Sequence, residues 1–334
     1  MSAAANALGR ARGGFRDGAG AWARRNLWTL GLFGLLIVFI ALTKLIQPNY
    51  GAPGIQGLAI SILPIAFAAV AQAIVVIAGG IDLSVGSMMA LASVTSAVLM
   101  KGQDDLTAGV IVGGTLLFGL LLGGINGALI VITKVPDIVV TLAMAFVWAG
   151  VALIVLHTPG GGAAPWLMAM ISGPLGSPWL PKALVVLAVV VGVVWIPLRR
   201  STLGLSLYAV GSDPLAAFRS GVPVGRTKII AYALTGLFSA IGGLSLTAST
   251  GIGSPVPGSY TLQSVAAIVL GGVSLAGGRG GVVGPIIAVV VLALIRTDLT
   301  FVGVNPNFST VVQGVILIGV VMFGSMVAMR KVRP

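Results

Sequence analysis

Asp82 is the residue whose type and setting most suggest chemistry, because its carboxylate lies between long apolar runs. It belongs to the stretch IAGGIDLSVGSMMA, residues 77–90, in a chain with only 7 acidic residues. The carboxylate could cap a helix by accepting hydrogen bonds from the free N–H groups at a helix start, or it could line the path of a polar solute. We favour the cap, at a helix that follows a break at Gly79 and Gly80, and the two roles are compatible.

A second set of candidates consists of uncharged polar side chains within or beside apolar runs, which could hydrogen-bond a neutral polar solute. Each could equally hydrogen-bond a neighbouring helix, and for each we favour that use. Together with Asp82 they form the predicted substrate pathway. The residues are Gln72, Ser84, Asn126, Thr141 and Gln263, and Gln313 is a further residue of this kind. The apolar runs hold no Glu, Lys or His relay, which argues against proton-coupled transport.

The segment 199–227 contains signals for a short helix between basic residues. Asp213 followed by Pro214 predicts an N-cap and a first helical residue, and Gly221 predicts the C-terminal end. Leu215 and Phe218 are three residues apart, so they share one face of this helix. That face must be buried either on the membrane surface or in a groove of another protein, and the pattern alone favours neither.

The residue sets of common enzymes are missing from the sequence. A nucleotide-binding P-loop reads G-x-x-x-x-G-K-[ST], and the nearest match, GVPVGRT (residues 221–227), has the wrong spacing and Arg for Lys. The chain has no Cys and one histidine, His157, which we expect in a water-facing loop. We therefore expect no enzyme activity, no metal site and no bound cofactor on this chain.

The composition requires a membrane, since 57% of the residues are hydrophobic and 8% are charged, whereas a soluble domain has roughly 25% charged residues. A bilayer-spanning helix needs about 20 apolar residues. The apolar runs therefore predict an all-α integral membrane protein with about ten transmembrane helices. The expected segments are 27–46, 57–78, 84–100, 107–132, 137–156, 182–198, 228–249, 260–276, 282–298 and 309–328. The eighth and ninth are short and flanked by glycine, so one of them is a candidate for a re-entrant or broken helix.

The basic residues predict the orientation, because Lys and Arg collect on the cytoplasmic side of membrane proteins. With a cytoplasmic N-tail (1–26), the loop 199–227 and the C-tail (329–334) are cytoplasmic too, and 27–328 forms one transmembrane domain. This orientation leaves few of the 19 Lys and Arg residues outside, namely Lys44, Lys101, Lys182 and Arg296. The net charge of +12 thus reflects membrane orientation, and we expect no nucleic-acid partner.

The chain also contains a short internal similarity. GGIDLSVG at 79–86 and GGVSLAGG at 271–278 share four residues at matching positions. Transporters are often built from structural repeats with the binding site between them. Chance similarity in a chain with 49 glycines is the alternative, and the expected number of spans would make such a repeat parallel rather than inverted.

Three segments resemble the ribose-type permease subunits of bacterial ABC importers for monosaccharides. They are AGGIDLSVGSMMAL (78–91), GLSLYAVGSDPLAAFRSGVPV (204–224) and SPVPGSYTLQSVAAIVLGGVSLAGGRGGVVGP (254–285). The resemblance extends over about residues 28–330. The chain departs from the family where Gly211, Ser212 and Asp213 replace a segment that usually reads closer to GGN, which could tune pairing with a particular ATPase.

The resemblance implies the permease of an ATP-driven importer for a monosaccharide or related small polar solute, with the ABC importer permease fold, in the bacterial cytoplasmic (inner) membrane. It implies a second permease copy or a paralogue, an extracytoplasmic sugar-binding protein, and an ATPase, usually two fused domains, that holds ATP and Mg. The coupling helix to that ATPase would comprise Gly211, Asp213, Pro214, Leu215, Ala217, Phe218, Arg219 and Gly221. The alternative is an ion-coupled secondary transporter or facilitator, which needs no ATPase.

Overall fold

The computed structural model describes residues 27–256 and 258–305, together with residues 308, 311, 312, 314, 315, 318, 319 and 322. Both predicted tails, 1–26 and 329–334, and most of the tenth predicted segment, 309–328, lie outside the described residues. The described secondary structure is helical apart from one small sheet. The helices are α2 (Leu27–Ile46), α3 (Ala52–Ile77), α4 (Val85–Met100), α5 (Asp105–Thr133), α6 (Asp137–Val155), α7 (Pro165–Ile171), α8 (Lys182–Arg200), α9 (Thr202–Ser212), α10 (Pro214–Arg219), α11 (Val224–Thr250), α12 (Tyr260–Leu270) and α13 (Val283–Phe301).

Seven of the described helices are long and apolar enough to cross a membrane, namely α2, α3, α5, α6, α8, α11 and α13. Two more apolar helices are shorter, α4 with 16 residues and α12 with 11. Each of the first nine predicted segments thus contains a helix, and the chain is a multi-pass membrane protein. The eighth segment, predicted as 260–276, is too long, because α12 ends at Leu270 where Gly271 and Gly272 follow.

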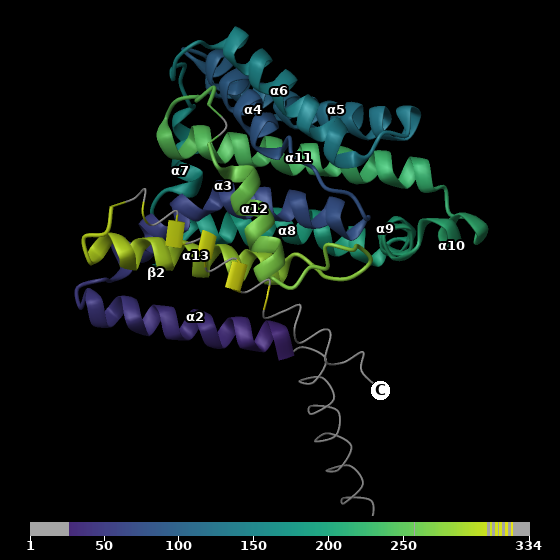
Figure 1. Cartoon of the computed structure of the whole chain (residues 1–334). Helices are drawn as coiled ribbons and strands as arrows, with labels where there is room; N and C mark the ends of the chain where they lie inside the picture. Colours follow the sequence, from purple (N-terminus) through teal and green to yellow (C-terminus); the bar gives the residue numbers. More distant parts are fainter. Residues whose placement is uncertain are drawn as a thin grey trace, which may run out of the picture.

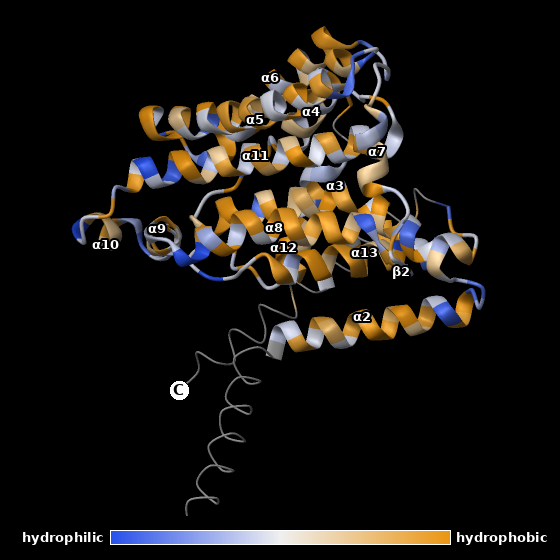
Figure 2. Ribbon diagram, turned by 180° about the vertical axis from the view of Figure 1, so that it is seen from behind, coloured by the Kyte–Doolittle hydropathy of each residue, from blue (hydrophilic) through white to orange (hydrophobic). Residues whose placement is uncertain are grey.

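The helices lie in layers, which Figures 1 and 2 show from opposite sides. The helices α4, α5 and α6 form one side, α11 lies next to them, α3 follows with α8 and α12, and α13 and α2 form the far side. Every residue of α3 from Ala66 to Ile77 is buried. A helix that is apolar all round belongs in such a core, so α3 lies inside the layers rather than against lipid.

Glycines let the central helix α11 approach α5 closely. Gly119, Gly123 and Gly127 recur every four residues on α5, and Gly236 lies opposite them on α11. A Cβ at Gly123 would overlap the Tyr232 carbonyl of α11, and one at Gly119 would lie 2.5 Å from the Gly236 carbonyl oxygen. Small residues at this spacing bring helix backbones together in membranes, which fixes the position of α11 against α5.

The hydrophilic residues gather toward two opposite ends of the molecule, as the blue segments of Figure 2 show. One end carries α9, α10 and the start of α11. The other carries the loop after α2 and the segment 157–182, which includes α7 and the antiparallel strands β1 (Pro174–Leu175) and β2 (Ser177–Pro181). His157, which was predicted in a water-facing loop, is exposed at the start of this segment.

Candidate functional site

The break between α3 and α4 is built by the two glycines that the sequence indicated. Gly79 has a left-handed φ of +80°. Its N–H donates to the Val76 carbonyl and the Gly80 N–H donates to the Val75 carbonyl, both over 2.9 Å. This pair of hydrogen bonds is the Schellman ending, which favours glycine at the left-handed position. The helix therefore stops inside the protein, and residues 78–84, here named the first loop, connect it to α4.

Asp82 lies in this loop and is fully buried. Its Oδ1 accepts hydrogen bonds from the Ser84 N–H, over 2.8 Å, and from the Ser84 hydroxyl, over 2.6 Å. The N-cap residue of α4 is Ser84, so the prediction that Asp82 itself occupies the cap was off by two residues. The carboxylate instead holds the cap residue in place. Its second oxygen, Oδ2, has no hydrogen-bond partner among the described residues.

A chain of buried hydrogen bonds runs from Asp82 across two further helices. The Asn126 amide of α5 donates from Nδ2 to the Ser84 hydroxyl over 2.8 Å. The Trp148 indole of α6 donates to Asn126 Oδ1 over 3.2 Å. We name Asp82, Ser84, Asn126 and Trp148 the Asp82 network. Asp82, Ser84 and Asn126 were predicted for the substrate pathway, whereas Trp148 was missed. A buried tryptophan looks like an ordinary core residue in the sequence, and only the hydrogen-bond acceptor that its indole N–H needs sets it apart.

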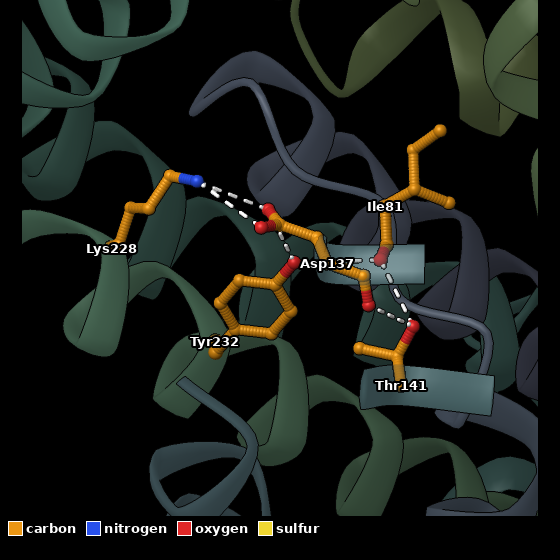
Figure 3. Close-up of polar contacts among 5 residues, drawn as sticks. All are labelled: Ile81, Asp137, Thr141, Lys228 and Tyr232. Atoms are coloured by element: carbon orange, nitrogen blue, oxygen red, sulfur yellow. Dashed lines mark hydrogen bonds and ion pairs between the residues drawn. The ribbon is translucent and has the colours of Figure 1, made fainter. Parts of the chain in front are cut away.

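A second polar cluster lies at the start of α6, and Figure 3 shows it. The Lys228 ammonium of α11 lies 3.2 Å from both carboxylate oxygens of Asp137. The Tyr232 hydroxyl donates to Asp137 Oδ2 over 3.0 Å. The carboxylate also lies at a helix N-terminus, where the helix dipole favours negative charge. We name Asp137, Thr141, Lys228 and Tyr232 the Asp137 cluster.

Thr141 joins this cluster to the first loop. Its hydroxyl lies 3.2 Å from the Ile81 carbonyl and 2.9 Å from the Asp137 carbonyl, and it accepts a hydrogen bond from the Leu83 N–H over 3.1 Å. A Cβ at Gly80 would lie 2.6 Å from the Tyr232 hydroxyl and 2.8 Å from Asp137 Oδ2. The cluster thus packs directly on the loop backbone, which needs such partners because a broken helix inside a membrane must be covered by protein.

Sequence reasoning missed the functional setting of Asp137, Lys228 and Tyr232. Asp137 was predicted only as the first residue of a span, and Lys228 only as a basic residue of the inner side. Their contact joins positions 91 residues apart. No local pattern reports such a contact, so the only available signal was an acidic and a basic residue at the ends of two predicted spans on the same side.

The remaining predicted pathway residues do not join these clusters through hydrogen bonds. Gln72 of α3 is fully buried, and neither its amide nitrogen nor its oxygen has a hydrogen-bond partner among the described residues. Gln263 of α12 donates to the Ser259 hydroxyl at the start of its own helix. Gln313 lies outside the described residues. The predicted set therefore separates into a connected group around Asp82 and Thr141 and two residues in other settings.

The predicted helix in the loop 199–227 is present as α10, with both ends as predicted. Asp213 Oδ1 accepts hydrogen bonds from the Leu215 and Ala216 N–H groups over 2.9 and 3.0 Å, and Pro214 is the first helical residue. Gly221 has a φ of +82°. The Gly221 and Val222 N–H groups donate to carbonyls of the last turn, each over 3.0 Å. The helix α9, which precedes α10, was not predicted.

The apolar face of α10 is exposed. The exposed fractions of Leu215 and Phe218 are 58% and 68%, and Arg219 beside them is exposed as well, whereas Ala217 is buried against the rest of the chain. Figures 1 and 2 place α10 at the edge of the molecule, at one of its hydrophilic ends. Water contact with two large apolar side chains is unfavourable, so this face calls for a covering surface, either the membrane or another protein.

Comparison with known proteins gives the family. The model of the family described as branched-chain amino acid transport system / permease component matches residues 54–321. The autoinducer 2 import system permease protein LsrD from Escherichia coli strain K12, Escherichia coli O157:H7 and Shigella flexneri is similar to this chain. Each is 31% identical over 311 residues, which cover 91% of this chain and 93% of the relative.

No solved structure matches the chain. The family match extends over both the Asp82 network and α10, and the relatives align over nearly their whole length. The resemblance to importer permeases drawn from the sequence motifs is thereby confirmed. This chain belongs to the family of branched-chain amino acid transport system permease components.

Proposed function

We propose that this chain is the membrane-spanning subunit of an ATP-driven ABC importer for a monosaccharide or a related small polar solute. It lies in the bacterial cytoplasmic membrane with about ten spans and both termini inside. The observation that carries the proposal is α10, a helix capped at both ends whose Leu215 and Phe218 project from the hydrophilic end. A permease driven by another chain's ATP hydrolysis needs such a docking element.

The proposed partner of α10 is an ATPase with an apolar groove, which holds ATP and Mg and supplies the hydrolysis that this chain does not perform. Isolated helices of six residues are not stable in water, so the caps at Asp213 and Gly221 matter: they keep α10 folded before the partner arrives. Amphipathic helices that enter hydrophobic grooves bind through such spaced apolar anchors. An ion-coupled transporter or facilitator, the alternative, gives the exposed face of α10 no role.

The types of the predicted pathway residues agree with a neutral, hydroxyl-rich solute, although Ser84, Asn126 and Thr141 already form hydrogen bonds within the protein. Apart from Asp82, the predicted pathway residues are amides and hydroxyls, which donate and accept hydrogen bonds without a net charge. The relatives are named for import of autoinducer 2. We propose that an extracytoplasmic binding protein delivers the solute and that a second permease copy or a paralogue completes the pathway.

The test is a mild-detergent purification of the tagged chain from its native membrane, with ATP hydrolysis and mass spectrometry as readouts. We expect an ABC ATPase to copurify with the unaltered chain and to be lost from the double variant Leu215→Ser, Phe218→Ser. The matched control is Leu106→Ser, since Leu106 at the start of α5 is a leucine that is even more exposed, at 79%. An unaltered, folded chain that transports solute in liposomes without any ATPase would overturn the proposal in favour of the alternative.

A further inference from the structure

The internal similarity in the sequence corresponds to a repeated chain break. The helix α12 ends as α3 does: the Gly272 N–H donates to the Val269 carbonyl over 3.1 Å, and the Val273 N–H donates to the Ile268 carbonyl over 2.9 Å. Gly272 has a φ of +80°, the same as Gly79. The structural equivalent of Gly79 is thus Gly272, one residue later than the sequence similarity indicated. Residues 271–282, here named the second loop, connect α12 to α13.

The two loops meet each other near the end of α9. The Gly278 N–H of the second loop donates to the Ile77 carbonyl at the end of α3, over 3.0 Å. A Cβ built on Gly277 would lie 3.0 Å from the Gly79 Cα. The second loop therefore packs backbone to backbone against the junction of α3 and the first loop, although the contacting residues are about 200 positions apart in the chain.

The backbone of Gly211, in α9, lies where the two loops meet. A Cβ at Gly211 would overlap the Ile77 carbonyl and would lie 2.6 Å from the Gly278 nitrogen. Gly211 in turn limits both neighbours: a Cβ at Gly79 would lie 3.3 Å from its Cα, and one at Gly277 would lie 2.5 Å from its carbonyl oxygen. Only glycine permits three backbones to come this close.

Gly211 is also coupled rigidly to α10. It lies two residues before Asp213, whose N–H closes α9 by donating to the Ala209 carbonyl over 3.1 Å and whose side chain caps α10. The Tyr208 hydroxyl of α9 donates to the Gly280 carbonyl of the second loop over 2.8 Å. A tyrosine hydroxyl is protonated at neutral pH and can donate, and burial raises the pKa of this one further. A displacement of α10 is therefore expected to move Gly211 as well.

We infer that Gly211 is the positioning residue through which movement of α10 displaces both loops at once. The inference rests on the proposed function and deepens it, since it names the contact by which a docked ATPase reaches the pathway. The first loop also carries Asp82, so a shift at Gly211 reaches the Asp82 network through the backbone of this loop, which Gly211 meets at Gly79. Close-packed interiors transmit such displacements rather than absorb them.

The test uses the absence of cysteine from the natural chain. Leu275→Cys places a single thiol in the second loop, at a residue with 48% exposure. Its rate of labelling by a charged maleimide is measured in membranes that contain the complex with its ATPase, with and without a non-hydrolysable ATP analogue. We expect the nucleotide to change the rate by about threefold or more, because it shifts the population of loop positions.

Three further variants are made in this reporter chain. Gly211→Ala introduces the overlap described above, Tyr208→Phe removes only the hydrogen bond to the second loop, and Gly281→Ala is the matched control. A Cβ at Gly281 meets no described atom within 4 Å, and its φ is not left-handed. We expect the nucleotide effect to be lost in Gly211→Ala, reduced in Tyr208→Phe and retained in the control, with the ATPase bound in all three.

The outcomes separate the inference from the proposed function. If the Gly211→Ala chain does not assemble with the ATPase, the inference is tested by Tyr208→Phe alone. An undiminished effect of the nucleotide on the labelling rate then overturns the inference, and a reduced effect supports it. A full effect in an assembled Gly211→Ala complex also overturns it. If the reporter chain itself copurifies with no ATPase and shows no nucleotide effect, the proposed function fails, and the inference fails with it.

Discussion

At the scale of single residues, one carboxylate oxygen of Asp82 accepts two hydrogen bonds from Ser84. We expect Asp82→Ala to lower the abundance of the folded chain, because it leaves the buried Ser84 N–H without its acceptor, at a cost of about 1–3 kcal/mol. Asp82→Asn retains an acceptor and should approach the natural abundance. Abundance is measured by fluorescence-detected size exclusion. Normal abundance of both variants with loss of transport would assign Asp82 to the solute instead.

The ion pair between Lys228 and Asp137 leads to a second residue-level prediction. Lys228→Met leaves the Asp137 carboxylate without its cation, although the Asp137 side chain is only 16% exposed. Because the pair is not fully buried, we expect a loss of about 1–2 kcal/mol, below the values for fully buried pairs. This loss is measured as a lower melting temperature of the variant in detergent.

The double variant Lys228→Met, Asp137→Asn removes both charges and should recover part of that loss, as a double-mutant cycle would measure. Lys101→Met, at an exposed lysine of the opposite end, serves as the control and should leave the melting temperature unchanged. The cycle is completed with Asp137→Asn alone. If the losses of the two single variants simply add up in the double variant, the pair does not stabilise the chain.

The two clusters differ in how far the sequence predicts them. Asp82 was recognisable because one charge between apolar runs stands out, and its contact with Ser84 spans only two positions. Asn126 was recognisable as a polar residue, but its partners were not, since they lie 42 and 22 residues away. Contacts of that kind depend on how α4, α5 and α6 pack, and residue type alone does not report the packing.

At the scale of elements, α10 depends on its first cap. We expect Asp213→Ala to weaken ATPase copurification although Leu215 and Phe218 are unchanged, because two N–H groups lose their acceptor, which costs about 1 kcal/mol in a helix of only six residues. Asp213→Asn is the matched control, since asparagine is an equally good cap. Weak copurification with the asparagine variant as well would mean that the charge of Asp213 binds the partner directly.

The ends of α10 were predictable because their signals are local: Asp-Pro at the start and glycine at the end act within one turn. The end of α12 was not, although Gly271 and Gly272 are there. Apolar residues such as Val273 and Leu275 extend the hydrophobic run beyond the glycines, and hydropathy reports burial in a membrane whether the chain is helix or loop. The helix stops where the left-handed glycine begins the second loop.

At the scale of the whole molecule, composition and charge predicted the class because both are sums over the chain. The order of the layers was not predictable from them, because the position of α11 depends on matched surfaces, such as Gly119 and Gly123 of α5 opposite Gly236 of α11. The helices α3 and α6 are similarly apolar, yet α3 is mostly buried and α6 is mostly exposed.

Sidedness is the prediction that tests the whole arrangement, since an importer can meet its ATPase only if α10 is cytoplasmic. The natural chain lacks cysteine, so single thiols can be placed at two exposed residues, Ser220 beside α10 and Thr158 at the opposite hydrophilic end. We expect a membrane-impermeant maleimide to label Thr158→Cys in intact spheroplasts and Ser220→Cys only after permeabilisation, as the positive-inside distribution requires. The reverse pattern would place α10 outside the cell, where no ATPase could reach Leu215 and Phe218, and would exclude ATP-driven coupling through this helix.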